Sequence, residues 1–173
     1  MRTFFAALLS LLIMAPVCNE KKSMTQVMML SSKDFKHEGP IPSIHTCEGQ
    51  DLQPELTWKN IPEKAQSLAL IMDDPDAPHG IFVHWVTWNL DPKLDKLSSE
   101  KKNQHQGTNS AGNLGYKGPC PPSGKHRYFF RLYALDIKLK LDSSTTKEEL
   151  LNAMKGHILG EAELMGTYQK SHS

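Results

Sequence analysis

Two histidines and two aspartates in this sequence have the side chains and the spacing to form a polar site. Asp74 and Asp76 belong to the stretch DPDAP, and His84 lies in the apolar run IFVHWVTWNL that follows it. His126 opens a second apolar run, HRYFFRLYALD. Histidines beside a carboxylate can bind an anion, hold a metal ion as a two-histidine, one-carboxylate set, or act as an acid–base pair for hydrolysis.

Each histidine follows a segment that is stiffened by proline and glycine, DPDAPHG before His84 and GPCPPSGK before His126. Proline fixes φ, so such segments can hold a turn in one place. We expect these turns to bring Asp74, Asp76 and backbone N–H groups to the strand ends where the histidines point. The alternative interpretation is that the prolines and glycines only form ordinary turns in loops, and that each histidine is a core residue hydrogen-bonded to the backbone.

The apolar runs predict a chain made mainly of strands. Residues 67–74 form a continuous apolar run, typical of a strand covered on both faces, and 81–90 and 126–136 are further strands. Shorter strands are expected at 24–30, at 55–58 and in the closing stretch AELMGTYQ.

One helix is predicted in STTKEELLNAMK, ending near Gly156. Thr145 or Thr146 would be its N-cap, because a glutamate follows three residues later. The residues expected to form its buried stripe are Leu150, Leu151 and Met154.

Side chains alternate along a strand, so residue parity predicts which of them share a face. His84 and His126 would then both lie on apolar faces. The residues predicted to share the face of His84 are Phe82, Val86, Trp88 and Leu90. Those predicted to share the face of His126 are Tyr128, Phe130, Leu132 and Ala134.

Length and charge restrict the class of protein. A chain of 173 residues usually forms one domain with a core of its own. Lys and Arg total 20 against 19 Asp and Glu, so no strong field of either sign is present. Nucleic acid is therefore excluded as the main partner, because such binding depends on clustered positive charge.

The first residues predict a secreted or periplasmic protein. One arginine precedes an apolar stretch from Phe4 to Val17, which is too short to span a bilayer but suits a signal peptide over residues 1–18. The alternative is that translation starts at Met24, which makes residues 1–23 non-native and the protein cytoplasmic. Beyond the leader the sequence has two cysteines, which suggest a disulfide in an oxidising compartment and free thiols in the cytosol.

Two longer stretches, LIMDDPDAPHGIFVHW and GYKGPCPPSGKHRYFF, resemble the paired signature of the phosphatidylethanolamine-binding proteins, which include the Raf kinase inhibitor protein. The stretches HTCEGQDLQPELTWKNIP and HILGEAELMGTY are similar to the bacterial and archaeal branch of that family. The resemblance covers residues 24–170. Two long motifs in the same order are far more specific than one short pattern.

The resemblance implies an antiparallel β-sandwich-like fold, mainly β, in which a large sheet packs on a smaller one with few short helices. It also implies a small pocket for phosphate-type anions. Matched by motif, the ligand-binding residues are Asp74, Asp76, His84, Gly118, Pro119, Pro122, His126 and Tyr128. Cys47 and Cys120 lie in HTCEGQD and GPCPP, both expected near the pocket, so we expect them to be close enough to bridge.

The expected function is binding of a phosphate monoester or a phospholipid headgroup, without catalysis and without a metal or other cofactor. Asp74 would orient one imidazole and favour its protonated form. The sequence has no H-x-x-x-H, G-x-S-x-G or similar motif that carries a nucleophile, which favours binding over hydrolysis. The alternatives are an inhibitor or scaffold that acts on a protein partner, such as a kinase or protease, and a metal-dependent or acid–base hydrolase.

Overall fold

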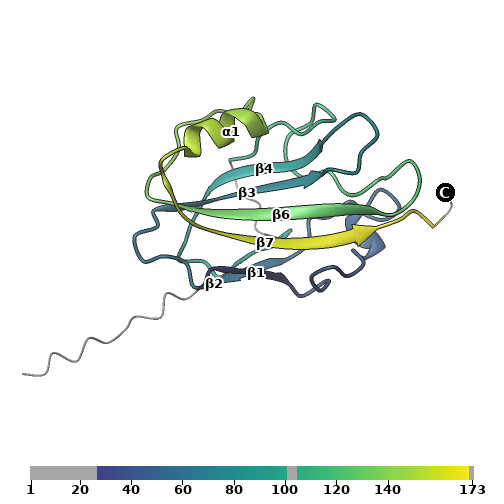
Figure 1. The fold of residues 1–173 in the computed structure, drawn as a ribbon, viewed down its shortest axis with the longest axis horizontal. Helices are drawn as coiled ribbons and strands as arrows, with labels where there is room; N and C mark the ends of the chain where they lie inside the picture. The colour runs from purple at the N-terminus through teal and green to yellow at the C-terminus, as the bar shows by residue number, and fades with distance from the viewer. Residues whose placement is uncertain (1–26, 101–104, 172–173) are drawn as a thin grey trace, which may run out of the picture.

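The computed structural model describes residues 27–100 and 105–171, which form two antiparallel sheets and one α-helix (Figure 1). The expected leader and Met24 lie outside the described residues. None of the helices in the described part of the chain is long and apolar enough to cross a membrane.

The large sheet has the strand order β4-β3-β6-β7, and the small sheet has the order β1-β2-β5. The large sheet consists of β3 (Ser67–Asp74), β4 (Phe82–Leu90), β6 (His126–Leu135) and β7 (Ile158–Tyr168). The small sheet consists of β1 (Met29–Ser32), β2 (Leu56–Lys59) and β5 (Lys96–Leu97). A 3₁₀ turn, η1, spans Ser43–His45. The predicted sandwich of a larger and a smaller sheet is confirmed, whereas the edge strand expected at 24–30 is β1 and begins only at Met29.

Both faces of the large sheet are covered, as the continuous apolar run of β3 predicted. Every residue of β3 is buried. One hydrophobic cluster fills the space between the two sheets and includes Trp58, Trp85 and Phe130. A second cluster lies on the other face, where Ile71 packs with Leu150 of the helix. Figure 1 shows the helix on one side of the large sheet and β1 and β2 on the other.

Helix α1 (Lys147–Met154) begins as the sequence predicted. Thr146 is its N-cap and forms a capping box with Glu149, in which each side chain bonds the other residue's backbone N–H. Leu150 and Met154 are fully buried. Leu151 packs against the same cluster but is only partly buried, so the prediction of a fully buried stripe was wrong for this residue.

Bulges in β4 break the alternation on which the parity prediction relied. Asp73 pairs with Val83 and Met72 with Trp85, so His84 is an extra residue without a direct partner on β3. A second register shift follows along the same two strands. Because a bulge changes which face the following side chains take, the residues predicted to share the face of His84 are divided. Val86 and Trp88 pack on the helix side, and Leu90 packs between the sheets.

Strand β6 is regular where it carries the second histidine. The predicted face is confirmed, because its residues all belong to the cluster between the sheets: Tyr128, Phe130, Leu132 and Ala134. His126 is the first residue of the strand and is itself buried.

The segment after β5 lies along the outer edge of β4. The amides of Gly107, Ser110 and Lys117 donate to carbonyls of β4, at 2.8, 2.9 and 2.9 Å respectively. The last of these bonds ends on the carbonyl of His84. This stretch therefore fixes the position of the GPCPP segment relative to the bulge.

Candidate functional site

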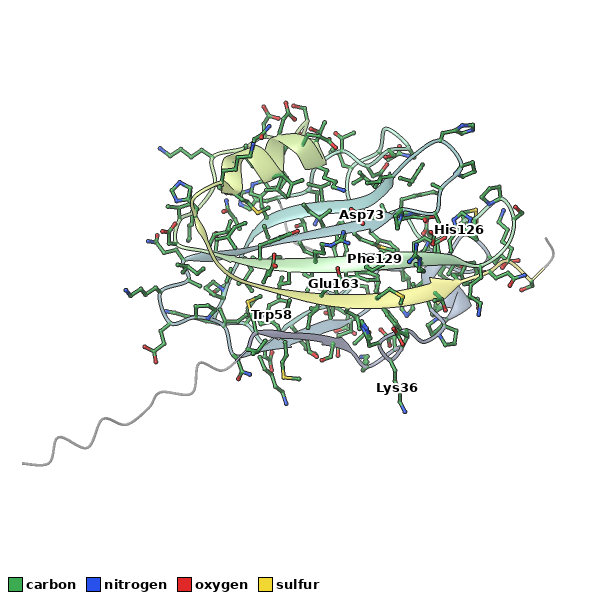
Figure 2. The ribbon with its side chains drawn as sticks, in the orientation of Figure 1. Lys36, Trp58, Asp73, His126, Phe129 and Glu163 are labelled. Carbon is green, nitrogen blue, oxygen red and sulfur yellow. A yellow bond between two sulfur atoms is a disulfide. The ribbon has the colours of Figure 1, made fainter. Side chains whose placement is uncertain are left out.

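A pocket of about 350 Å³ lies at the end of the large sheet where β3 ends and where β4 and β6 begin. Figure 2 shows His126 at this end of β6, among the loops. The residues that line the pocket are Asp74, Ala77, Pro78, His79, Phe82, His84, Lys117, Gly118, Cys120, Pro121, Pro122 and His126.

Asp74 and His126 form a buried pair in the pocket. The Nδ1 of His126 lies 2.7 Å from the Oδ2 of Asp74, and their side chains are only 9% and 4% exposed. The other carboxylate oxygen, Oδ1, accepts from the backbone N–H of Asp76 at 2.8 Å. A carboxylate accepts hydrogen bonds, so the Nδ1 of His126 is the donor and its ring orientation is set by Asp74.

His84 is held by the backbone in a similar way. Its Nδ1 lies 2.6 Å from the carbonyl oxygen of Lys117. A carbonyl only accepts, so Nδ1 carries a proton. Burial lowers the pKa of His84 below the usual 6.5, although the hydrogen bond to Lys117 and the charge of Asp74 act in the opposite direction. His84 is therefore neutral at pH 7 in the free protein, with a lone pair on Nε2.

The arrangement leaves the same atom of each imidazole available to a ligand. In the described part of the chain, neither the Nε2 of His84 nor that of His126 makes a hydrogen bond, and both residues line the pocket. An Nε2 accepts a hydrogen bond when the ring is neutral and donates one when the ring is protonated. The pair can thus hold an anion if a proton enters with it, or deprotonate a bound group.

Two aromatic rings pack against His84. The ring of Phe82 lies 4.7 Å from it, and the ring of Tyr128 meets it edge-on at 5.2 Å. The Tyr128 hydroxyl is fully buried and has no hydrogen-bond partner among the described residues. Burial, together with the nearby charge of Asp74, raises the pKa of Tyr128 well above its usual range. Tyr128 therefore stays protonated and supports the histidine from behind.

The GPCPP segment forms one wall of the pocket and is attached at several points. A disulfide joins Cys47 to Cys120, with their Cα atoms 5.5 Å apart, so the expected proximity of the two cysteines is present. The Cys47 amide donates to the carbonyl of Pro119 at 3.1 Å, and the Gly118 amide donates to Oδ1 of Asp51 at 2.6 Å. These contacts tie the wall to the segment that follows η1.

The structure brings together five of the eight residues proposed from the sequence. The five that line the pocket are Asp74, His84, Gly118, Pro122 and His126. The three that do not are Asp76, Pro119 and Tyr128.

Each of these three has another structural role. Pro119 is buried behind the wall, and Tyr128 lies behind His84. Asp76 binds the side chain of Arg127 through both carboxylate oxygens, at 2.7 and 2.9 Å. This pairing lowers the pKa of Asp76 to about 2. Its role is to fasten the DPDAP turn to the start of β6.

Sequence reasoning missed several lining residues, and two of them are basic. His79 lies within the stiff segment DPDAPHG, and Lys117 directly precedes the stiff segment GPCPPSGK. A basic residue directly next to a predicted pocket wall was the signal that could have identified them. The Nζ of Lys117 lies 3.5 Å from Asp51.

The metal site that the sequence left open has no counterpart in the geometry. Within residues 27–100 and 105–171, no group of three or more histidine, cysteine, aspartate or glutamate side chains is arranged to hold a metal ion. Asp74 instead faces the ring of His126 directly.

Comparison with known proteins identifies relatives of the whole domain. A sequence profile described as phosphatidylethanolamine-binding protein matches residues 31–169. A UPF0098 protein of Methanothermobacter thermautotrophicus is 49% identical over 150 residues, which cover 83% of this chain and 99% of that protein. A UPF0098 protein of Chlamydia muridarum is 46% identical over 149 residues, covering 83% and 99%.

Two solved structures share the fold. CT736 from Chlamydia trachomatis, described as a phosphatidylethanolamine-binding protein homologue, superposes with a TM-score of 0.81 at 44% identity, covering 84% of this chain and 99% of its own. YbcL from E. coli, described as a new member of the mammalian family, gives a TM-score of 0.77 at 27% identity, covering 84% and 100%. The similarity therefore extends across both sheets and both motifs.

Proposed function

The chain belongs to the phosphatidylethanolamine-binding protein family, and from this premise we propose that its pocket binds a small anion of the phosphate type without transforming it. One observation carries the proposal. Two buried imidazoles have their Nδ1 atoms fixed to acceptors of the protein, which leaves both Nε2 atoms for a ligand in the same pocket.

The protonation of the site determines how it binds an anion. Because His84 is neutral in the free protein, its Nε2 presents a lone pair that repels an anionic oxygen. Binding is favourable once a proton occupies that nitrogen or the bound phosphate oxygen. With the proton in either place, a charge-assisted hydrogen bond joins the imidazole to the phosphate. Binding of a dianion to neutral His84 is therefore accompanied by the uptake of one proton.

The choice of binding over hydrolysis rests on the side chains of the pocket. The lining contains no serine or threonine, and its one cysteine, Cys120, is bonded to Cys47. Covalent catalysis needs an activated nucleophile beside a base. Steady release of inorganic phosphate from a monoester by the pure protein would establish hydrolysis instead, whether a water molecule or one of the pocket histidines attacks the phosphorus.

We also propose that the protein works in an oxidising compartment, outside the cytosol. The support is the disulfide at the pocket wall, since such bonds persist mainly in exported proteins. Mass measurement of the mature protein from its native host tests this: an unprocessed or reduced chain would contradict it.

Anion affinity should increase as the pH falls. Sulfate is the most informative probe because it does not titrate in this range, so any change reports the protein alone. The pKa of His84 lies below 6.5, and sulfate affinity should therefore rise from pH 8 down to that lowered pKa, by up to about tenfold per pH unit for one proton taken up. Calorimetric titration measures it, and a sulfate affinity that is flat from pH 8 to pH 5 would refute the mechanism.

His84→Ala and His126→Ala should each weaken binding of phosphate at pH 6 by at least about tenfold, because a charge-assisted hydrogen bond contributes roughly 1.5–3 kcal/mol. His157→Ala is the matched control. His157 also pairs with an aspartate, at 2.8 Å, but this pair is 40% and 43% exposed and does not line the pocket. Equal, unchanged affinities in all three variants would place the anion site elsewhere.

Asp74→Asn should weaken binding several-fold at pH 6 and move its pH dependence towards acid. Asparagine can still accept from the Nδ1 of His126, but it lacks the charge that acts to raise the pKa of His84. Asp136→Asn, which alters the exposed partner of His157, should leave the profile in place. The same sulfate titration, run on both variants, compares them. A profile of Asp74→Asn that overlies the wild-type curve would show that this carboxylate has no electrostatic role.

A further inference from the structure

The pocket also has features that select among anions. We infer that it prefers a phosphate-type anion carrying a compact apolar group over one carrying an ammonium group. This inference rests on the proposed function, because it concerns the remainder of the ligand whose anionic end meets the two histidines.

The charges that line the pocket disfavour a cationic substituent. Asp74 is the single acidic residue among the lining residues. Its side chain is only 4% exposed, and each of its oxygens already accepts one hydrogen bond, from His126 and from the amide of Asp76. The remaining titratable side chains of the lining are basic, and they include His79 and Lys117. An ammonium group on the ligand would lose water without meeting an exposed carboxylate, which is unfavourable.

The shape of the pocket favours an apolar substituent. Phe82 and Pro78 contribute apolar surface from the DPDAP side, and Pro121 and Pro122 contribute it from the opposite wall. The volume of about 350 Å³ exceeds what a single phosphate group needs and falls at the lower end of the ~300–1,000 Å³ typical of small-molecule sites. Proline walls are rigid, so little conformational entropy is lost when a flat or compact group enters.

A cation–π contact with Phe82 is the strongest argument for an ammonium ligand, because a quaternary ammonium binds well over an aromatic ring. Here the ring of Phe82 already lies 4.7 Å from His84, tilted by 51°. When the anion is bound with its proton on His84, that ring is next to a positive charge. A second cation at Phe82 would then be repelled by the first.

Two pairs of isosteric ligands isolate the charge of the substituent. Propyl phosphate has the shape of phosphoethanolamine without the ammonium, and 3,3-dimethylbutyl phosphate has the shape of phosphocholine. In calorimetric titrations at pH 6 we expect the neutral member of each pair to bind at least about fivefold more tightly. Phenyl phosphate should exceed inorganic phosphate by at least about fivefold, through the apolar area that it buries.

The outcomes separate this inference from the proposed function. If none of the phosphates binds, the proposed function fails. If all bind with equal affinity, or if phosphoethanolamine or phosphocholine binds more tightly than its neutral isostere, the proposed function stands and the inference is overturned.

Variants of Phe82 test the apolar contact directly. Phe82→Leu keeps an apolar side chain of similar bulk but removes the ring. It should reduce the ratio of phenyl phosphate affinity to inorganic phosphate affinity about threefold, and the ratio is the quantity compared because Phe82 also packs against His84. Phe82→Ala should remove the advantage. Phe129→Ala is the control, since Phe129 lies on β6 outside the pocket and packs against Arg131 instead (Figure 2). A phenyl phosphate preference that survives in both Phe82 variants would contradict the inference.

Discussion

Replacing Cys47 and Cys120 together by serine is expected to lower the free energy of unfolding by about 4 kcal/mol, the largest effect of any substitution considered. The disulfide joins residues 73 positions apart, and in the chain-entropy model a crosslink of that span removes this much conformational freedom from the unfolded chain. The folded variant should also bind phosphate more weakly, because Cys120 belongs to the pocket wall. Urea unfolding of the oxidised wild type and the double variant measures the difference.

The matched control is the wild-type protein unfolded with a thiol reductant present, which should approach the stability of the double variant. Thiol titration of the unreduced protein purified from its native host, after denaturation, shows whether the bond exists in the first place. Two free thiols, or an equal stability with and without reductant, would contradict this prediction.

The strands were predictable because their apolar runs carry the signal at short range. The structure places β3, β6 and the start of α1 within one or two residues of the expected positions. Both a fully buried strand and a capping box depend on residues that are close together in the sequence, so the sequence alone can reveal them. The bulge at His84 was not predictable in this way. It depends on how β4 pairs with β3, which is a long-range property, and it reversed the faces assigned to Val86 and Trp88.

The candidate site could be predicted where its residues lie within one continuous sequence motif. Resemblance of the motifs pointed to His84 and His126, and the structure places both in one pocket. It could not distinguish residues that line the pocket from residues that hold its parts together. Asp76 lies in the same motif as Asp74, but its carboxylate turns to Arg127. That choice depends on a contact between two segments 51 positions apart in the chain.

Gly118→Ala should produce the second-largest loss, about 3 kcal/mol of stability, together with loss of anion binding of at least about tenfold. A Cβ at this position would lie 2.3 Å from Oδ1 of Asp51, 2.4 Å from the carbonyl oxygen of His45 and 2.9 Å from the Cα of Thr46. Two of these atoms belong to the backbone, so no change of side-chain rotamer relieves the overlap. The wall must move away from the segment after η1 and widen the pocket.

Gly124→Ala is the control that separates crowding from backbone strain. Gly124 lies in the same proline- and glycine-rich segment but outside the pocket lining; its φ is +70°, and a Cβ there meets nothing within 4 Å. The alanine variant should lose about 1 kcal/mol through its left-handed backbone and keep its phosphate affinity. Thermal or urea unfolding and phosphate titration of both variants make the comparison. Since the second contact of Gly118 is with a carbonyl, adding Asp51→Ala to Gly118→Ala should not restore binding. Restoration would mean that only the carboxylate of Asp51 constrains the wall.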